Sequence, residues 1–129
     1  MVIDTSAIVA LLNNEADAEL FEIAVADAPQ ACMSTATVLE CSLVLESRYG
    51  DLGGQKLDLL ISEQEIEIVP FNANQLRIAR AAFHRFGKGR HPAQLNFGDC
   101  FSYALAKERG LPLLYKGRDF SQTDVESMF

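Results

Sequence analysis

The chain has 129 residues, of which 49 % are hydrophobic and 22 % are charged. This length and composition predict a single globular domain over residues 1–129 and argue against a disordered chain. No apolar run reaches the roughly 18 residues that a membrane span needs, and no basic and apolar leader precedes the first strand, so we expect a cytoplasmic protein without a membrane partner.

The net charge of −7 argues against non-specific binding to nucleic acids, but the charges are unevenly distributed. Residues 1–68 contain thirteen acids and two bases, whereas residues 69–98 contain five bases and no acid. The three cysteines are scattered, which predicts reduced thiols in the core and excludes a zinc finger or a disulfide scaffold.

Apolar periodicity and chain breakers predict strands that alternate with helices. The expected strands are 1–4, 30–33, 66–69 and 112–115, with one further edge strand in the tail. The expected helices are 5–13, 16–28, from the cap Ser34 to about 48, 55–63, 72–86 and 96–109. This order predicts an α/β fold with a parallel sheet covered on both faces, whose functional crevice lies at the carboxyl ends of the strands.

Two acids stand where that crevice is expected. Asp4 ends the first strand, although an aspartate in this position is also a common helix N-cap. Glu40 shares a helical face with apolar and small residues, and a buried carboxylate requires a cation, a metal or a raised pKa as compensation. The alternative for Glu40 is a partly exposed helix edge.

Further acids begin the last helix and follow the last strand. Asp99 lies three residues after Asn96, a spacing that suits a capping box as well as a metal ligand. Asp119 and Asp124 lie in the final loop. A parallel sheet could bring all of these acids to one edge, where Mg²⁺ or Mn²⁺ would compensate their repulsion and activate water for phosphoryl transfer.

These residues resemble the PIN-domain family, and most closely its VapC-type toxin ribonucleases. The resemblance covers nearly the whole chain and is carried by four segments: MVIDTSA (1–7), STATVLE (34–40), GKGRHPAQLNFGDCFSYALA (87–106) and LLYKGRDF (113–120). It implies a three-layer α/β/α sandwich with a central, mainly parallel sheet of four or five strands. It also implies a metal-dependent endoribonuclease that is inhibited by a cognate VapB-type antitoxin and forms a homodimer. The apolar helical residues between 36 and 60 are the candidate dimer surface.

The resemblance further implies a role for each matching residue. Asp4 and Asp99 would bind Mg²⁺ directly, Glu40 would act through water, and Thr5 or Ser6 would orient Asp4. Many family members have an acid or Asn at a position of the last motif that is Gly117 here. The fourth acid is therefore expected to be Asp119, with Asp124 as the alternative or as support for the pocket.

The basic stripe supplies candidates for RNA contact. The helix cations Arg77, Arg80 and Arg85 are expected to be solvated on an outer face. The preferred candidates come from the loops near the pocket: Lys88, Arg90, His91, Lys116 and Arg118. Two other interpretations remain open: a catalytically silent PIN-like binding module and a receiver-type signalling domain. A receiver domain needs an acceptor Asp after a middle strand, and this sequence has none there.

Overall fold

The computed structural model describes residues 1–129 and contains four strands and six α-helices. In chain order the elements are β1 (Val2–Ile3), α1 (Thr5–Leu12), α2 (Ala18–Asp27), β2 (Cys32–Ser34), α3 (Thr35–Tyr49), α4 (Asp51–Glu63), β3 (Glu67–Val69), α5 (Ala73–Phe86), α6 (Phe97–Arg109) and β4 (Leu113–Leu114), followed by a 3₁₀ turn (Phe120–Gln122). The expected alternation of strands and helices is confirmed, and the tail contributes an isolated bridge from Ser127 to Leu113 in place of a full edge strand.

The four strands form one parallel sheet in the order β3-β2-β1-β4. The central strand β1 pairs with β2 through Val2 and Cys32, and with β4 through Val2 and Leu113. Because every strand runs in the same direction, all four carboxyl ends lie at one edge of the sheet. The chain reaches each of the outer strands, β3 and β4, through helices that cross over from the preceding strand. The crevice at the carboxyl edge is therefore formed by helices as well as by loops.

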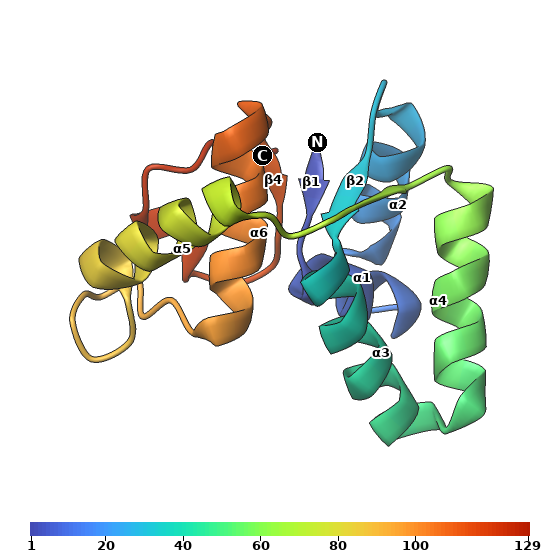
Figure 1. Ribbon diagram of the computed structural model, residues 1–129. Coiled ribbons are helices and arrows are strands. Elements are labelled where there is room, and N and C mark those ends of the chain that lie inside the picture. Colours follow the sequence, from blue (N-terminus) through green and yellow to red (C-terminus); the bar gives the residue numbers. More distant parts are fainter.

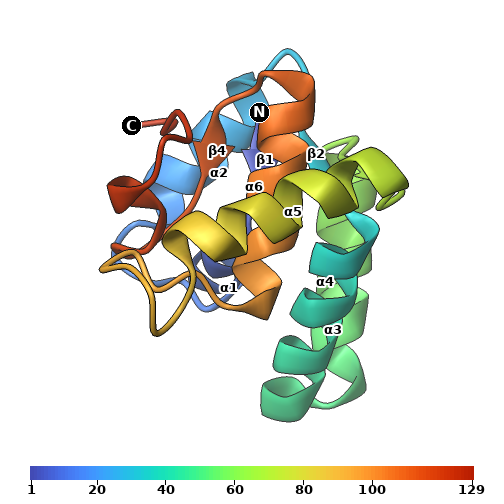
Figure 2. The ribbon, with the colours of Figure 1, turned by 60° about the vertical axis from the view of Figure 1, so that its left-hand side comes forward.

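Helices cover both faces of the sheet, which confirms the three-layer α/β/α sandwich (Figure 1). Alternate residues of β1 point to opposite faces: Ile3 packs into a core with α1 to α4, whereas Val2 packs into a core with α5 and α6. Figure 2 shows α5 crossing in front of α6, and α3 and α4 extending together beyond the carboxyl edge of the sheet.

The helix termini follow the capping rules that the sequence indicates. Asp4, Ser34 and Asn96 are N-caps whose side chains accept backbone N–H groups of α1, α3 and α6, respectively. Gly110 ends α6 at φ 62°, in the left-handed region that glycine adopts without strain. Asp4 directly follows β1 and Ser34 is the last residue of β2, so at both places the chain turns into a helix at the carboxyl edge, where the predicted site lies.

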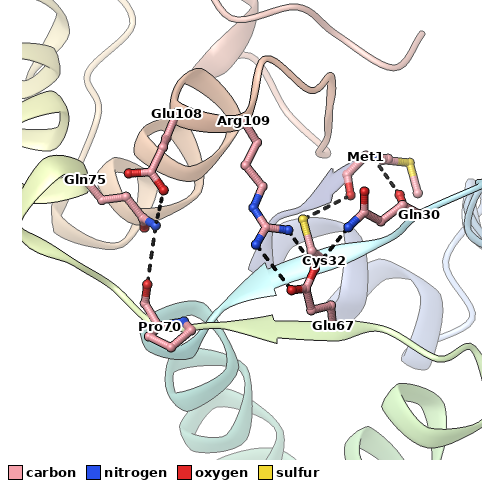
Figure 3. A network of polar contacts seen from close by, with 8 residues as sticks. All are labelled: Met1, Gln30, Cys32, Glu67, Pro70, Gln75, Glu108 and Arg109. Atoms are coloured by element: carbon pink, nitrogen blue, oxygen red, sulfur yellow. Dashed lines mark hydrogen bonds and ion pairs between the residues drawn. The ribbon is translucent and has the colours of Figure 1, made fainter.

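A polar network ties the opposite edge of the sheet to α6 (Figure 3). Arg109 donates two hydrogen bonds to the carboxylate of Glu67 on β3, at 2.6 and 3.2 Å. Glu108 accepts a hydrogen bond at 3.0 Å from the fully buried Gln75 of α5, which also donates to the carbonyl of Pro70. The far end of α6 is thereby fixed, and its first turn is held in place at the carboxyl edge.

The start of α4 differs from the prediction. The helix was expected from residue 55, because glycines at 53 and 54 favour a turn, but it begins at Asp51. Gly53 lies inside the helix because α4 packs closely on α3 there: a Cβ atom at this position would lie 2.3 Å from the carbonyl oxygen of Leu45. Close helix packing has therefore overridden the low helix propensity of glycine.

We expect Gly53→Ala to destabilise the protein by about 2 kcal/mol, because the added methyl meets backbone that cannot move without separating α3 from α4. Thermal unfolding followed by circular dichroism should show a melting temperature lower by roughly 5–10 °C. Gly54→Ala is the matched control, since a Cβ atom there meets only the flexible carboxylate of Glu46. Equal melting temperatures for the two variants would contradict the packing argument.

None of the helices has both the length and the apolar character that crossing a bilayer requires.

Candidate active site

Four acids from four different elements meet at the carboxyl edge of the sheet. Asp4 follows β1, Glu40 lies on α3, Asp99 lies in the first turn of α6, and Asp119 follows β4. Their proximity is visible in their electrostatics, because the charges of Asp4, Asp119 and Glu40 each raise the pKa of Asp99. The structure therefore brings together the four acids that were predicted to converge.

Asp4 is 3 % exposed and is held by hydroxyl and backbone donors. Its Oδ2 accepts hydrogen bonds from the backbone N–H and the hydroxyl of Ser6, at 3.0 and 2.7 Å. Its Oδ1 accepts the hydroxyl of Ser102 on α6 at 2.6 Å. The Ser6 hydroxyl in turn accepts the backbone N–H of Lys116 at 3.0 Å, which joins the loop after β4 to the same network. These donors compensate the burial of the carboxylate and fix its orientation.

Glu40 is half-buried on the face of α3 that looks towards α1 and α6. Its Oε1 accepts a hydrogen bond from the hydroxyl of Thr5, which lies in the first turn of α1. Its Oε2 lies against Gly98, since a Cβ atom on that glycine would be only 2.0 Å away. Thr5 thus orients Glu40, whereas Ser6 orients Asp4, and only glycine at position 98 leaves room for the Glu40 carboxylate.

Asp99 both caps α6 and titrates abnormally. Its Oδ2 accepts the backbone N–H of Asn96 at 3.0 Å, and the Asn96 side chain accepts the backbone N–H of Asp99 at 2.9 Å, which confirms the capping box. Burial and the neighbouring carboxylates raise the pKa of Asp99 to about 7, although the Asn96 N–H acts in the opposite direction.

The two candidates for the fourth acid occupy different places. Asp119 is exposed at the end of the loop after β4, where Gly117 adopts φ 102°. Asp124 accepts the Tyr103 hydroxyl and pairs with Lys107 and Arg85 at 3.3 and 3.4 Å. Asp124 thus fastens the tail to α5 and α6, and its support of the pocket stays a prediction.

The residues predicted to contact RNA fall into two groups: some form no ion pair within this chain, and others already contact residues of this chain. Lys88, Arg90 and Arg118 are exposed and form no ion pair. Lys116 pairs with Glu15 and Asp17 at 3.5 and 3.3 Å, so acids of this chain already neutralise it.

The histidine of the same loop is also engaged. The ring of His91 packs on Phe86, and its Nδ1 accepts the backbone N–H of Ala93 at 3.0 Å. This histidine braces the loop that leads into α6. Its contacts give it a structural task in addition to the RNA contact predicted for it.

Two residues of the site were not assigned a role from the sequence. Ser102 donates to Asp4 and lies 3.3 Å from the hydroxyl of Thr37, which joins α6 to α3 behind the carboxylates. Gly98 admits the Glu40 carboxylate. The sequence does contain an indication for Ser102, because its position one helical turn after Asp99 predicts that both residues lie on the same face of the helix. Gly98 has no local signal, because the neighbour that requires it, Glu40, comes from another helix.

The donor set fits a hard divalent cation that keeps much of its water. All candidate ligands are carboxylate oxygens, which Mg²⁺ and Mn²⁺ prefer. No three His, Cys, Asp or Glu side chains are close enough together to hold a metal ion by themselves. Mg²⁺ is commonly held by one or two carboxylates with water completing its shell, and Asp4 and Asp99 would be the candidate ligands for such a site.

Comparison with known proteins gives consistent results. The PIN domain family model matches residues 1–126. A ribonuclease VapC from Mycolicibacterium smegmatis is 56 % identical over 128 residues, which are 99 % of each chain. Ribonuclease VapC30 from Mycobacterium tuberculosis is 53 % identical over 128 residues, covering 99 % of this chain and 98 % of that protein.

Solved structures share the fold at lower sequence identity. The sarcin-ricin loop cleaving toxin VapC20 of Mycobacterium tuberculosis superimposes with a TM-score of 0.78 at 20 % identity, covering 96 % of this chain and 95 % of that chain. VapBC2 from Rickettsia felis, bound to a DNA fragment from its promoter, gives 0.72 at 15 % identity, covering 98 % and 94 %. These neighbours have the same three-layer architecture.

Proposed function

The chain belongs to the PIN-domain family, and on this basis we propose that it is an endoribonuclease toxin of a toxin–antitoxin pair. The relatives that are named ribonucleases match it over almost their whole length. The observation that carries the proposal is the cluster of four acids at the carboxyl edge, in which three carboxylates raise the pKa of the fourth. Such a cluster is suited to the hydrolysis of RNA phosphodiester bonds with Mg²⁺ or Mn²⁺ as the cofactor.

Each acid has a defined task in this mechanism. Asp4 and Asp99 would hold the cation, which when bound acidifies water and neutralises charge on the reacting phosphate. The hydroxyls of Ser6 and Ser102 hold the Asp4 carboxylate in its orientation. Glu40, fixed by the Thr5 hydroxyl, would position the attacking water and accept its proton. Asp119, on the exposed loop, would complete the acidic rim of the pocket.

Two protein partners belong to the proposal. Two of the structural neighbours are VapBC complexes from Rickettsia felis and Salmonella typhimurium, which supports a VapB-type antitoxin as the inhibitor of this chain. A homodimer is proposed through the segment 36–60, where the large side chains of Leu39, Leu43, Leu52 and Leu59 are all exposed. Clustered exposed leucines are typical of a surface that another chain covers.

We expect the purified chain to cleave a mixed RNA pool with Mg²⁺ and to lose this activity with EDTA. Asp4→Asn should lower the rate by roughly a thousand-fold or more, because the carboxylate charge is lost while the amide can still hydrogen-bond to both serines. Asp58→Asn, an exposed acid of α4, is the matched control and should cleave like the wild type.

Gel electrophoresis of end-labelled RNA gives the cleavage rates, and calorimetry gives Mg²⁺ binding. Metal binding without cleavage of any RNA would favour the catalytically silent module instead. The receiver-type alternative is excluded by the family assignment, and β3 is followed by Pro70 and Phe71 where an acceptor Asp would be needed.

A further inference from the structure

A groove of about 930 Å³ lies between α5 and the first turns of α6. One wall is formed by α5, whose Arg77, Arg80 and His84 share a face because they are spaced by three and four residues, and Arg90 extends this wall from the next loop. Apolar side chains of α5 line the same wall: Leu76, Ala79, Ala81 and Phe83. The opposite wall consists of aromatic rings on α6 and on the segment that leads into α5. Both helices lie side by side in Figures 1 and 2.

The cations of the groove are not neutralised by the protein. Arg77, Arg80 and Arg90 are exposed and form no ion pair, and no acid lines the groove. Four other cations of the chain do pair with acids: Arg85, Lys107, Arg109 and Lys116. In a chain of net charge −7, this surface therefore has a local positive charge that fits a polyanion.

The opposite wall offers flat rings to a ligand. Phe97 is 81 % exposed, and the row of rings continues edge to face through Phe101 to Phe71, with centroid distances of 4.9 and 4.7 Å. An exposed phenyl ring beside arginines that form no ion pair is the combination by which proteins bind single-stranded nucleic acid: bases stack on the ring and phosphates contact the cations. A duplex keeps its bases stacked inside and cannot use the ring.

The position of the groove favours RNA over a protein ligand. Phe97 and Asp99 both lie in the first turn of α6, so the groove opens at the same end of this helix that carries the carboxylate cluster. An amphipathic peptide with acidic residues would also fit the walls, but it has no need to reach the carboxylates. We propose that a single-stranded segment of the substrate lies in this groove, with a base on Phe97 and phosphates on Arg77, Arg80 and Arg90.

This assignment rests on the proposed function and deepens it, because it names the surface and the residues that hold an unpaired segment of the substrate. It also changes the interpretation of two helix cations. Arg77 and Arg80 were expected to be merely solvated, whereas the structure places them in the groove wall. Arg85, from the same helix, points elsewhere and pairs with Asp124.

The test measures binding separately from cleavage. In the Asp4→Asn background, fluorescence anisotropy with Mg²⁺ would compare a labelled single-stranded RNA of mixed sequence with a duplex of equal length. We expect tighter binding of the single strand, a loss of about ten-fold for Phe97→Ala, and recovery with Phe97→Tyr, which restores a ring. Arg80→Gln should reduce the slope of log affinity against log salt by about 0.7.

Arg48→Gln, an exposed cation at the end of α3, is the matched control and should bind like the parent. In the wild-type background, Phe97→Ala should raise KM more than it lowers kcat. Because Phe97 is so exposed, its replacement leaves the core intact, which thermal unfolding would verify.

Unchanged RNA binding in Phe97→Ala and Arg80→Gln overturns the assignment, and so does a parent that does not bind the single strand. If these variants instead change the oligomeric state in light scattering, or weaken binding of an acidic amphipathic peptide, with RNA binding unaffected, the groove is a protein interface and the assignment is wrong. A failure of the proposed function is seen separately, as wild-type chain that does not cleave RNA with Mg²⁺.

Discussion

Asp99→Asn is expected to abolish RNA cleavage, by roughly a thousand-fold or more, and at the same time to stabilise the metal-free protein at neutral pH. The first effect follows from the loss of a charged ligand. The second follows from the environment of Asp99, where burial and the charges of Asp4, Asp119 and Glu40 make ionisation unfavourable. An asparagine retains an oxygen for the Asn96 N–H, so the capping box survives.

The stability effect has a defined dependence on pH. The folded protein has a pKa of about 7 at Asp99, against the ordinary value of 3.8, so between these values the folded state binds the proton more tightly than the unfolded state. The protonated Asp99 therefore contributes to the free energy of unfolding at acidic pH, and this contribution is lost as the pH rises towards 7. Above pH 7 we expect Asp99→Asn to be more stable by about 1–2 kcal/mol, since solvent screens part of the shift.

Thermal unfolding of the metal-free proteins from pH 4 to 8 checks this expectation. The melting temperature of Asp99→Asn should exceed that of the wild type by roughly 5 °C at pH 8, and the difference should shrink towards pH 4. Mg²⁺ should raise the melting temperature of the wild type and have little effect on the variant. Asp58→Asn serves again as the control, and a variant that cleaves RNA at the wild-type rate would refute the role of Asp99.

The order of the elements and the edge of the sheet that carries the site could be predicted from local sequence signals. A strand that ends at Asp4, and the pair Asn96 and Asp99 with the spacing of a capping box, are local patterns, and the structure confirms both. The start of α4 could not be predicted this way. It depends on the distance between Gly53 and the backbone of Leu45, which only the packing of two helices determines.

The same distinction applies to individual residues of the site. Asp119 and Asp124 have similar surroundings in the sequence, but only Asp124 makes a tertiary contact with Tyr103 and Lys107. Arg80 looks like an ordinary solvated helix cation, and its place in the groove depends on the neighbouring α6. Residues whose role is set by a partner from a distant segment leave no local pattern to be found.

Gly98→Ala tests the most specific of these distant contacts. The added Cβ atom would lie 2.0 Å from Oε2 of Glu40, so the carboxylate must leave its place beside Asp99 and the Thr5 hydroxyl. Only the end of a flexible side chain has to move, and alanine suits a helix better than glycine, so we expect the fold to persist. Cleavage should fall by roughly 10–100-fold, as for other losses of residues that support a metal site.

A double-mutant cycle identifies the cause of that loss. If Gly98→Ala acts by displacing Glu40, it should have almost no further effect on the cleavage rate in a Glu40→Ala background. Gly54→Ala is the matched control, because its Cβ would lie 2.7 Å from Oε1 of Glu46, an exposed glutamate of α3 outside the site. It should cleave like the wild type. Equal losses from Gly98→Ala with and without Glu40 would show that the glycine acts on the reaction by another route, and the task assigned to the Glu40 carboxylate would then have to be abandoned.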